Sequence, residues 1–394
     1  MANNPIGPLV PADEMFHHQV AETFASVGTT DRDFTEKVCA MAARTDGGLQ
    51  LGFGLGKYPN RNVMDAYAGI SRGKEQITVR ASRELWPDTD RTTIGPIEYE
   101  VLEPLRSVRF ALQPNDIQPI AFEWIFESIV PCHMEERTHQ RNQLHTHVSA
   151  ELIRYHQTGL AVSGWVEIDG VRETIGSPHD ANGWVSTRDH SWGVRYGVGQ
   201  EPTDLQPNPF LDSVDFSMIW CPISCVRPDG SRYGLFLHPQ YAWYSNTLVR
   251  KAVIGGVEHP DGRFEEFVDI DLDFEYDPRT RRLRGGVAHC RMLDGSDRPL
   301  TFRVPTDTGF HLGVGLYFGF RGHHHGEWRG PYHQDGERIP DCTDESIFRD
   351  VHQLRDTFVI VDDPVGGGTG YGNCQPMITG EHPSSGLTRA TSFV

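Results

Sequence analysis

Short runs in which apolar and polar residues alternate occupy most of this chain, and they limit its fold more than any other feature. In "VDIDLDFEYD" (Val268 to Asp277) every second residue is apolar and those between are acidic. Side chains alternate between the two faces of a strand, so such a run packs one face on a core or cavity and leaves the other wet. Glycine (41) and proline (26) separate these runs, as turns do. The pattern predicts an all-β fold.

Turn and helix signals refine this prediction. Asp169-Gly170 stands between two alternating runs, which is a strong signal for a two-residue β-hairpin. Helix is scarce, and the best candidates are Thr35–Arg44 and a segment near Thr343–Leu354, where Thr343 is placed to cap the helix. We therefore expect antiparallel strands with little helix.

The length of 394 residues favours two domains. We place an N-terminal β domain at residues 1–180 and a C-terminal β domain at residues 181–394, joined through "GSPHDANG" (residues 176–183). The stretch from Val365 onward is rich in glycine and serine, and it predicts an extended C-terminal tail or an arm lying on a partner. Exposed sheet edges and such an arm favour a homodimer.

Composition excludes several classes of function. Acidic residues number 54 against 36 Lys plus Arg, and the net charge of -18 repels nucleic acid and anionic membrane surfaces. No signal peptide and no membrane-spanning run are evident. Seven scattered cysteines do not suggest a disulfide framework and fit a reducing compartment. These features predict a cytoplasmic protein that acts on a small molecule.

Two other motifs invite a ligand. "LGFGLGKYPNRN" (Leu51 to Asn62) resembles a phosphate loop, but it lacks the required spacing and is flanked by strands, so a strand whose glycines admit close neighbours fits better. In "RGHHHGEWRG" (Arg321 to Gly330), His323 and His325 would share a face of a strand, and His145 and His147 repeat that spacing. Histidines lining a polar cavity or the surface are the better interpretation, and we expect no metal and no cofactor.

The segment "RDHSWGVR" (Arg188 to Arg195) concentrates polarity between plain strands. On a strand, Arg188, His190 and Trp192 would face one side and Asp189 the other, whereas in a turn these side chains could converge. One interpretation is structural: Arg188, Asp189 and Arg195 form a buried salt-bridge network and Trp192 packs in a core. The other is chemical, because an imidazole beside a carboxylate can exchange protons near neutral pH. The spacing alone does not separate the two.

This segment, "SGWVEIDG", "YPNRNVMDAYAG", "VLEPLRSVRF" and "HGEWRGPYHQDGERIPDCT" together resemble the hydroxyneurosporene synthase and AttH-like group. That group includes carotenoid 1,2-hydratases and many uncharacterised bacterial proteins, and the chain is more similar to the uncharacterised branch. The resemblance covers roughly residues 45–350. It implies two lipocalin-like β-barrel or sandwich domains with apolar interiors suited to a terpenoid, lipid or polycyclic ligand.

From these observations we predict a cofactor-independent lyase, such as a hydratase or dehydratase, acting on a hydrophobic terpenoid, steroid or aromatic molecule. Asp189 is the candidate acid, since burial raises the pKa of a carboxyl group. His190 would accept a proton or orient water, and Arg188 and Arg195 would fix the carboxylate or a substrate oxygen. An arginine in contact with Asp189 would lower its pKa, and His190 would then be the acid and base.

Aromatic and polar residues on other strands would line the ligand cavity. The candidates are Trp192, Trp165, Tyr67, Tyr241, Trp243 and His238, with Asp65 and Arg61 beside Tyr67. The alternative function is a carrier that binds a lipid or terpenoid without changing it. A carrier predicts that the charges of the central segment pair with one another, whereas an enzyme predicts a titratable group that faces the cavity with a perturbed pKa.

Overall fold

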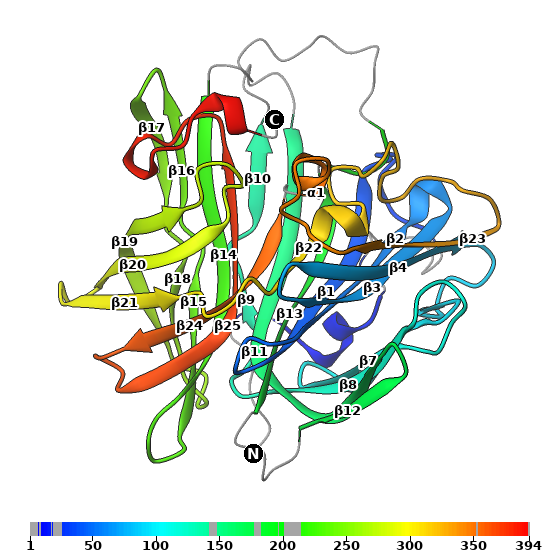
Figure 1. Cartoon of the computed structure of the whole chain (residues 1–394), viewed down its shortest axis with the longest axis horizontal. Helices are drawn as coiled ribbons and strands as arrows, with labels where there is room; N and C mark the ends of the chain where they lie inside the picture. Colours follow the sequence, from blue (N-terminus) through cyan, green and yellow to red (C-terminus); the bar gives the residue numbers. More distant parts are fainter. Residues whose placement is uncertain are drawn as a thin grey trace.

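The computed structural model describes residues 7, 9–16, 18, 26–141, 148–176, 183–195, 197–200, 214–351 and 354–392. Two antiparallel β-sheets lie side by side, with the first at the right and the second at the left of Figure 1. The predicted all-β class is confirmed. The linker 177–182 and the pair His145 and His147 fall outside the described residues.

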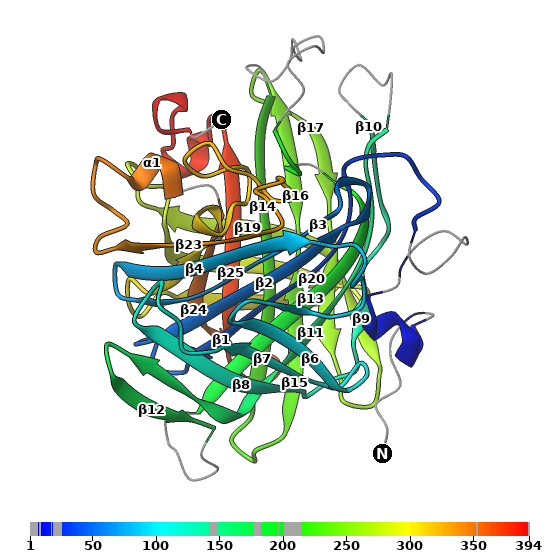
Figure 2. The same ribbon diagram turned by 90° about the vertical axis from the view of Figure 1, so that its right-hand side faces the viewer.

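The first sheet is open and curled (Figure 2). Its main path runs β23-β4-β3-β2-β1-β13-β11-β8-β7-β6-β5, and β9, β10 and β12 pair with the long strand β11. Its strands are β1 Phe34–Arg44, β2 Gln50–Tyr58, β3 Val63–Arg72, β4 Glu75–Glu84, β5 Thr93–Ile94, β6 Ile97–Glu103, β7 Ser107–Leu112, β8 Ile120–Ser128, β9 His133–Met134, β10 Thr138–Arg141, β11 Val148–Ile168, β12 Val171–Ile175, β13 Trp184–Val194 and β23 Tyr332–Ile339.

The second sheet closes on itself. Eight strands follow the path β15-β18-β19-β20-β21-β24-β25-β14, and β14 also pairs with β15, which completes a barrel. Of the two barrels expected, the described strands close only this one by hydrogen bonds. Its strands and their attachments are β14 Val214–Val226, β15 Arg232–Leu237, β16 Gln240–Tyr244, β17 Thr247–Ala252, β18 Gly255–Glu258, β19 Phe264–Tyr276, β20 Leu283–Met292, β21 Asp297–Arg303, β22 Gly309–His311, β24 Arg355–Asp363 and β25 Gly368–Thr379.

Helix is scarce, as expected, and of the candidate near Thr343–Leu354 only the four residues of α1, Phe348–Val351, are α-helical in the described part of the chain. The helical elements are η1 Pro11–Glu14, η2 Pro59–Arg61, η4 Leu312–Gly315, α1 Phe348–Val351, η5 Pro383–Ser385 and η6 Arg389–Thr391. The hairpin at Asp169-Gly170 is confirmed, because both residues have positive φ and Ile168 pairs with Val171. The predicted helix over Thr35–Arg44 is wrong: this segment is β1, held between β2 and β13. Both of its faces are buried, which removes the alternation that marks a half-exposed strand.

The expected C-terminal tail is also wrong over much of its length, because Gly368–Thr379 is the barrel strand β25. Its glycines seat neighbouring side chains rather than loosen the chain. A Cβ at Gly370 would lie 2.4 Å from the side chain of Ile223, and one at Gly368 would lie 2.7 Å from the Tyr233 hydroxyl. Tertiary packing thus overrides the low strand preference of glycine.

The glycine run of β2 behaves as the strand interpretation predicted. A Cβ at Gly54 would lie 2.3 Å from the ring of Tyr67, and one at Gly52 would lie 2.7 Å from the ring of Phe310. The missing side chains therefore admit aromatic rings against the backbone of β2. Phe310 belongs to β22, so this packing also holds the second half of the chain on the first sheet.

A segment of the second half crosses over to the first sheet. After β21, residues 309–351 run over β1 to β4, and β23 pairs with β4 along its length from Tyr332↔Arg83 to Ile339↔Gln76. Figure 2 shows β23 beside β4. Likewise β13, which follows the proposed boundary at residue 180, pairs with β1 and β11 of the first sheet. The two-domain division stays a prediction, and the sheets do not coincide with it.

The apolar cores fill the inside of each sheet. Phe53, Phe110 and Trp124 pack within the curl of the first sheet, and all eight barrel strands contribute to a second core that includes Ile270 and Phe302. The sheets meet where β11 and β13 contact β14 and β25. Among the described residues no helix is long and apolar enough to cross a membrane. Because side chains fill both cores, room for a ligand has to be sought between the sheets.

Candidate functional site

The central segment forms β13, and the two faces of this strand contact different parts of the protein. Strand alternation sends Arg188, His190 and Trp192 to one face and Asp189 to the other, as the sequence predicted. The first face meets the N-terminal segment around η1. The second face looks toward the barrel, across the gap between the sheets.

Arg188 is fully buried and paired. Its guanidinium donates to both carboxylate oxygens of Glu14, at 2.7 and 2.5 Å, and to Gln157. The Glu14 oxygens also accept hydrogen bonds from the hydroxyls of Tyr99 and Tyr155, at 2.9 Å each. The Arg188 guanidinium holds the pKa of Glu14 below its usual range, despite burial, which acts to raise it. The structural interpretation is thus right for Arg188, but the partner is Glu14 and not Asp189.

His190 lies on the same face and is occupied as well. Its Nε2 is 3.0 Å from a carboxylate oxygen of Glu36, and its Nδ1 is 3.1 Å from the Tyr155 hydroxyl. Trp192 stacks on the ring of His18, with centroids 3.5 Å apart. Asp189 and His190 do not pair, because adjacent residues of a strand point to opposite faces. The polar groups of Arg188 and His190 are thus engaged on the face opposite Asp189, although Arg188 also borders the cavity on the Asp189 side.

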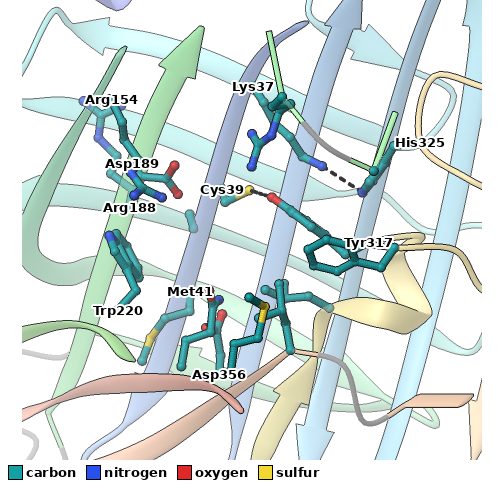
Figure 3. Close-up of a pocket in the computed structure, with 18 of the residues that line it drawn as sticks. Lys37, Cys39, Met41, Arg154, Arg188, Asp189, Trp220, Tyr317, His325 and Asp356 are labelled. Atoms are coloured by element: carbon teal, nitrogen blue, oxygen red, sulfur yellow. Dashed lines mark hydrogen bonds between the residues drawn. The ribbon is translucent and has the colours of Figure 1, made fainter. Parts of the chain in front are cut away.

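The face that carries Asp189 borders a cavity of about 160 Å³ between the sheets (Figure 3). β1, β11 and β13 form one wall, β14, β24 and β25 the other, and the crossing segment closes one side. The lining residues are Thr35, Lys37, Cys39, Ala40, Met41, Tyr58, Arg154, Thr187, Arg188, Asp189, Arg195, Gly197, Val198, Met218, Trp220, Leu312, Tyr317, Phe318, His325, Leu354, Asp356, Asn373, Gln375 and Met377.

Asp189 is the acid that faces this space. Among the residues the structure describes, its carboxyl group makes no hydrogen bond and no ion pair. Burial raises its pKa, and the charges of Arg154 and Arg195 only partly oppose this. The anticipated lowering of the pKa by an arginine therefore does not prevail. Arg195, which also lines the cavity, donates to the Ser191 hydroxyl at 3.3 Å.

A second acid, Asp356, enters from the barrel side on β24. One of its oxygens accepts hydrogen bonds from the amides of Asn373 and Gln375, at 2.9 and 2.8 Å. Burial raises its pKa to about 6, against the effect of these two donors, and the charge of Asp189 adds to the increase. Two carboxyl groups with raised pKa values thus face one cavity from opposite sheets.

Lys37 and Cys39 project from β1 on the same side. Cys39 pairs directly across from Asp189 in the strand register. Its sulfur lies 2.9 Å from the Tyr317 hydroxyl, and burial raises the pKa of the thiol to about 11. The Lys37 amine lies 2.7 Å from Nε2 of His325. Figure 3 shows Lys37 and Asp189 directed into the same space from neighbouring strands.

The other predicted lining residues do not line the cavity. Tyr67 lies behind it, with its hydroxyl 4.0 Å from the sulfur of Cys39. Trp165 lies under the guanidinium of Arg172 at the β11–β12 hairpin, and Tyr241 and Trp243 stack on each other in β16. Of the two residues named beside Tyr67, Asp65 contacts His325 and Arg61 pairs with Asp33.

His238 belongs to a buried charge cluster at the junction of the sheets. Glu135 lies 3.6 Å from His238 and 3.2 Å from His156, and the other nitrogen of His156 is 3.0 Å from Glu258. The two carboxylates raise the pKa of His156 to about 9, against the effect of burial. Glu135 also pairs with Arg154, which links this cluster to the wall of the cavity.

Two sets of histidines bear on metal binding. His18, Glu36 and His190 hold one potential ligand atom each within 4.8 Å of one another. Hydrogen bonds already join them, at 2.7 Å from His18 to Glu36 and 3.0 Å from His190, and the pKa of Glu36 is lowered to about 2 by these two histidines although burial opposes them. In the "HHH" run, His323 pairs with Glu327 while His325 contacts Asp65, so the expected shared face is wrong. In this run His323 and His325 form isolated β-bridges, to Phe320 and Val198, and no continuous strand is present.

Sequence reasoning missed Lys37, Cys39, Arg154, Tyr317 and Asp356. A helix predicted over Thr35–Arg44 gives no reason to place Lys37 and Cys39 on a cavity wall. A signal is present for Lys37, since the chain has only four lysines and this one directly precedes the apolar run Val38–Ala43. Asp356 gave no such signal, because nothing local indicates that Arg355–Asp363 faces the first sheet.

Fold and site together define an all-β protein with a closed eight-stranded barrel docked on an open curled sheet and a polar cavity between them. Residues 9–388 match the model of the Family of unknown function (DUF8625), and the chain belongs to that family. No protein with a curated description matches the sequence.

Solved structures align along most of the chain. A protein assigned as AttH from Nitrosomonas europaea is 12% identical, with 87% of this chain and 92% of that one covered and a TM-score of 0.43. CghA with Sch210972 is 9% identical, with 88% of each chain covered and a TM-score of 0.38. Kievitone hydratase from Nectria haematococca is 7% identical, with 87% and 88% covered and a TM-score of 0.37. The AttH-like group recognised from sequence motifs is thus represented among them.

Proposed function

We propose that this chain is a lyase that adds or removes water by acid–base chemistry, acting on a compact molecule with an apolar body held between the two sheets. The observation that supports this most is Asp189. Its carboxyl group faces the cavity without a partner among the described residues, and burial raises its pKa. A carrier has no need for an unpaired acid on its cavity wall, whereas proton transfer to a substrate uses one.

The surrounding residues suggest which group transfers protons and which stabilises charge. Asp189 transfers a proton to or from the reacting atoms, and Asp356, with its pKa near 6, is the second group for proton transfer. Arg154 and Arg195 carry positive charge into the same space and stabilise negative charge that develops on a substrate oxygen. These positive charges favour an elimination that passes through a negatively charged oxygen. They would oppose protonation of an isolated alkene, because that step creates a carbocation.

The cavity also limits the size of the substrate. At about 15 Å³ for each water-sized position, a volume of about 160 Å³ holds roughly ten such positions. Met41, Met218, Met377 and Trp220 supply apolar, adaptable contacts. A compact terpenoid or aromatic compound fits this space better than a long carotenoid polyene.

The test is a mass-spectrometric comparison of a panel of terpenoid, steroid and phenolic compounds incubated with three forms of the full chain. The forms are wild type, Asp189→Asn and the control Asp273→Asn, which changes an exposed residue of β19. We expect a product shifted by the mass of water, unaffected in the control and reduced about 100-fold or more in Asp189→Asn. Compounds that co-purify unchanged and bind all three forms equally would instead identify a carrier.

A further inference from the structure

The amine of Lys37 is set in an unusual position for a lysine. The side chain is 2% exposed, and it reaches into the cavity from β1. Its Nζ lies 2.7 Å from Nε2 of His325 and 3.7 Å from the centre of the Tyr317 ring. Within the described part of the chain no carboxylate is close enough to form an ion pair with it. A buried lysine is normally neutralised by a carboxylate, so this one is held for another reason.

His325 is fixed from behind by Asp65. Its Nδ1 lies 3.3 Å from both oxygens of Asp65, which also accepts hydrogen bonds from the backbone N–H of Gly326 at 2.7 Å and the Tyr58 hydroxyl at 3.1 Å. These donors and His325 keep the pKa of Asp65 below its ordinary value despite burial, so it is a carboxylate. Nδ1 of His325 therefore carries the proton and Nε2 offers a lone pair to Lys37. His325 is a positioning residue for the amine.

The chain of contacts Asp65–His325–Lys37 is the arrangement in which a carboxylate orients an imidazole and the imidazole orients a nucleophile. The crossing segment brings His325 to β1 and β3, so the arrangement exists only in the folded chain. Figure 3 shows the amine between His325 and the open space of the cavity. We propose that Lys37 is a nucleophile that forms an imine with the carbonyl carbon of an aldehyde or ketone bound in this cavity.

The step balances without any added reagent. The neutral amine attacks the carbonyl carbon, a C–N bond forms, and the carbonyl oxygen takes up a proton to give a carbinolamine. Loss of that oxygen as water and of the nitrogen proton leaves the imine, so amine plus carbonyl gives imine plus water. Asp189, across the same cavity, is the available donor for the departing oxygen. This inference rests on the proposed function for its use of the cavity, and it names the substrate class: a carbonyl compound with a hydroxyl group two carbons away, which an imine makes easy to eliminate.

The electrostatic surroundings agree with a nucleophilic amine. Burial lowers the pKa of Lys37 to about 8, and the charge of Arg195 acts in the same direction, while Cys39, Asp65 and Asp189 oppose it. At pH 7.5 roughly a quarter of such amines are neutral, against roughly one in a thousand for an ordinary lysine. A desolvated lysine near another cation is a known route to an amine that attacks carbonyl groups.

The experiment traps the imine chemically. Full-length protein is incubated with benzaldehyde and sodium cyanoborohydride at pH 7.5, and the reduced adduct is located by peptide mass spectrometry. The chain has four lysines, Lys37, Lys57, Lys74 and Lys251. We expect at least about tenfold more adduct on Lys37 than on the exposed, ion-paired Lys74, and the same in Lys57→Arg. His325→Phe should reduce labelling of Lys37 about tenfold, because phenylalanine keeps a ring and removes the positioned acceptor.

The result that overturns the inference is an unmodified Lys37 in wild-type protein while Lys74 and Lys251 are labelled. Trapping requires no turnover, so the two proposals are separable. If Lys37 is labelled but no compound of the panel gives a product shifted by the mass of water, imine formation at Lys37 stands and the lyase proposal is rejected. Product formation with an unlabelled Lys37 would leave the lyase and reject the imine.

Discussion

Asp356 should cost the folded protein stability at neutral pH, and replacing it by asparagine should recover that stability. The residue is 7% exposed, and its pKa is about 6 in the fold against an ordinary value of 3.8. A difference of roughly two units corresponds to about 3 kcal/mol. Asparagine keeps an oxygen to accept from Asn373 and Gln375, so Asp356→Asn removes the charge and retains the hydrogen bonds.

The dependence on pH gives this prediction its sign. Between pH 4 and pH 6 the folded state holds a proton on Asp356 that the unfolded state has released, so wild-type stability falls as pH rises through this range. Below pH 4 both states are protonated and the substitution changes little. Above pH 6 the full cost is present. The advantage of Asp356→Asn should therefore be about 1 kcal/mol at pH 4.5 and about 3 kcal/mol at pH 7.5.

Urea unfolding of wild type, Asp356→Asn and the exposed control Asp273→Asn at both pH values measures the difference. The difference in unfolding free energy between Asp273→Asn and wild type should be the same at the two pH values. If Asp356→Asn differs from wild type by the same amount at pH 4.5 and pH 7.5, then Asp356 ionises normally and the reasoning about its burial is wrong. A variant that is more stable but less active would also place Asp356 in the chemistry of the cavity.

Two further substitutions test the buried charges outside the cavity. Arg188→Ala should destabilise the fold by about 3 to 5 kcal/mol, because it leaves Glu14 buried without its partner, and a loss below 1 kcal/mol in urea unfolding would contradict this. The raised pKa of His156, about 9, stabilises the folded protein by about 3 kcal/mol. This stabilisation is complete below pH 6.5 and is lost as the pH rises through 9. His156→Gln should abolish this slope between pH 6 and pH 10, and an unchanged slope would show that the Glu135–His156–Glu258 cluster is not charged as inferred.

Much of the fold follows from alternation alone. The half-exposed strands, the hairpin at Asp169-Gly170 and the side of β13 on which Asp189 lies were all accessible from the sequence, because a strand's period of two is a local property. Strands buried on both faces carry no such mark. This is why the helix predicted over Thr35–Arg44 is wrong and why Lys37 escapes notice, whereas β25 is hidden by glycines that indicate a loop.

The partners of the site residues were beyond local reasoning. Arg188 and Glu14 are 174 positions apart, and Lys37 and His325 are 288 positions apart. Each pair forms because tertiary structure brings distant segments together, and neither sequence neighbourhood specifies the other. For the same reason the sequence alone does not decide between a salt-bridge network and a reactive acid. In the structure both occur: Arg188 is paired on one face of β13, and Asp189 lies unpaired on the other among the described residues.

The crossing of β23 has a consequence for how the chain is made. Residues 332–339 supply the strand that covers the edge of β4, so the first sheet cannot be completed until most of the 394 residues have left the ribosome. Until then β4 presents unpaired backbone groups, the kind of edge that attracts other strands. His325 arrives with the same segment. During synthesis, protection of the nascent sheet and assembly of the Lys37 site are therefore one late event.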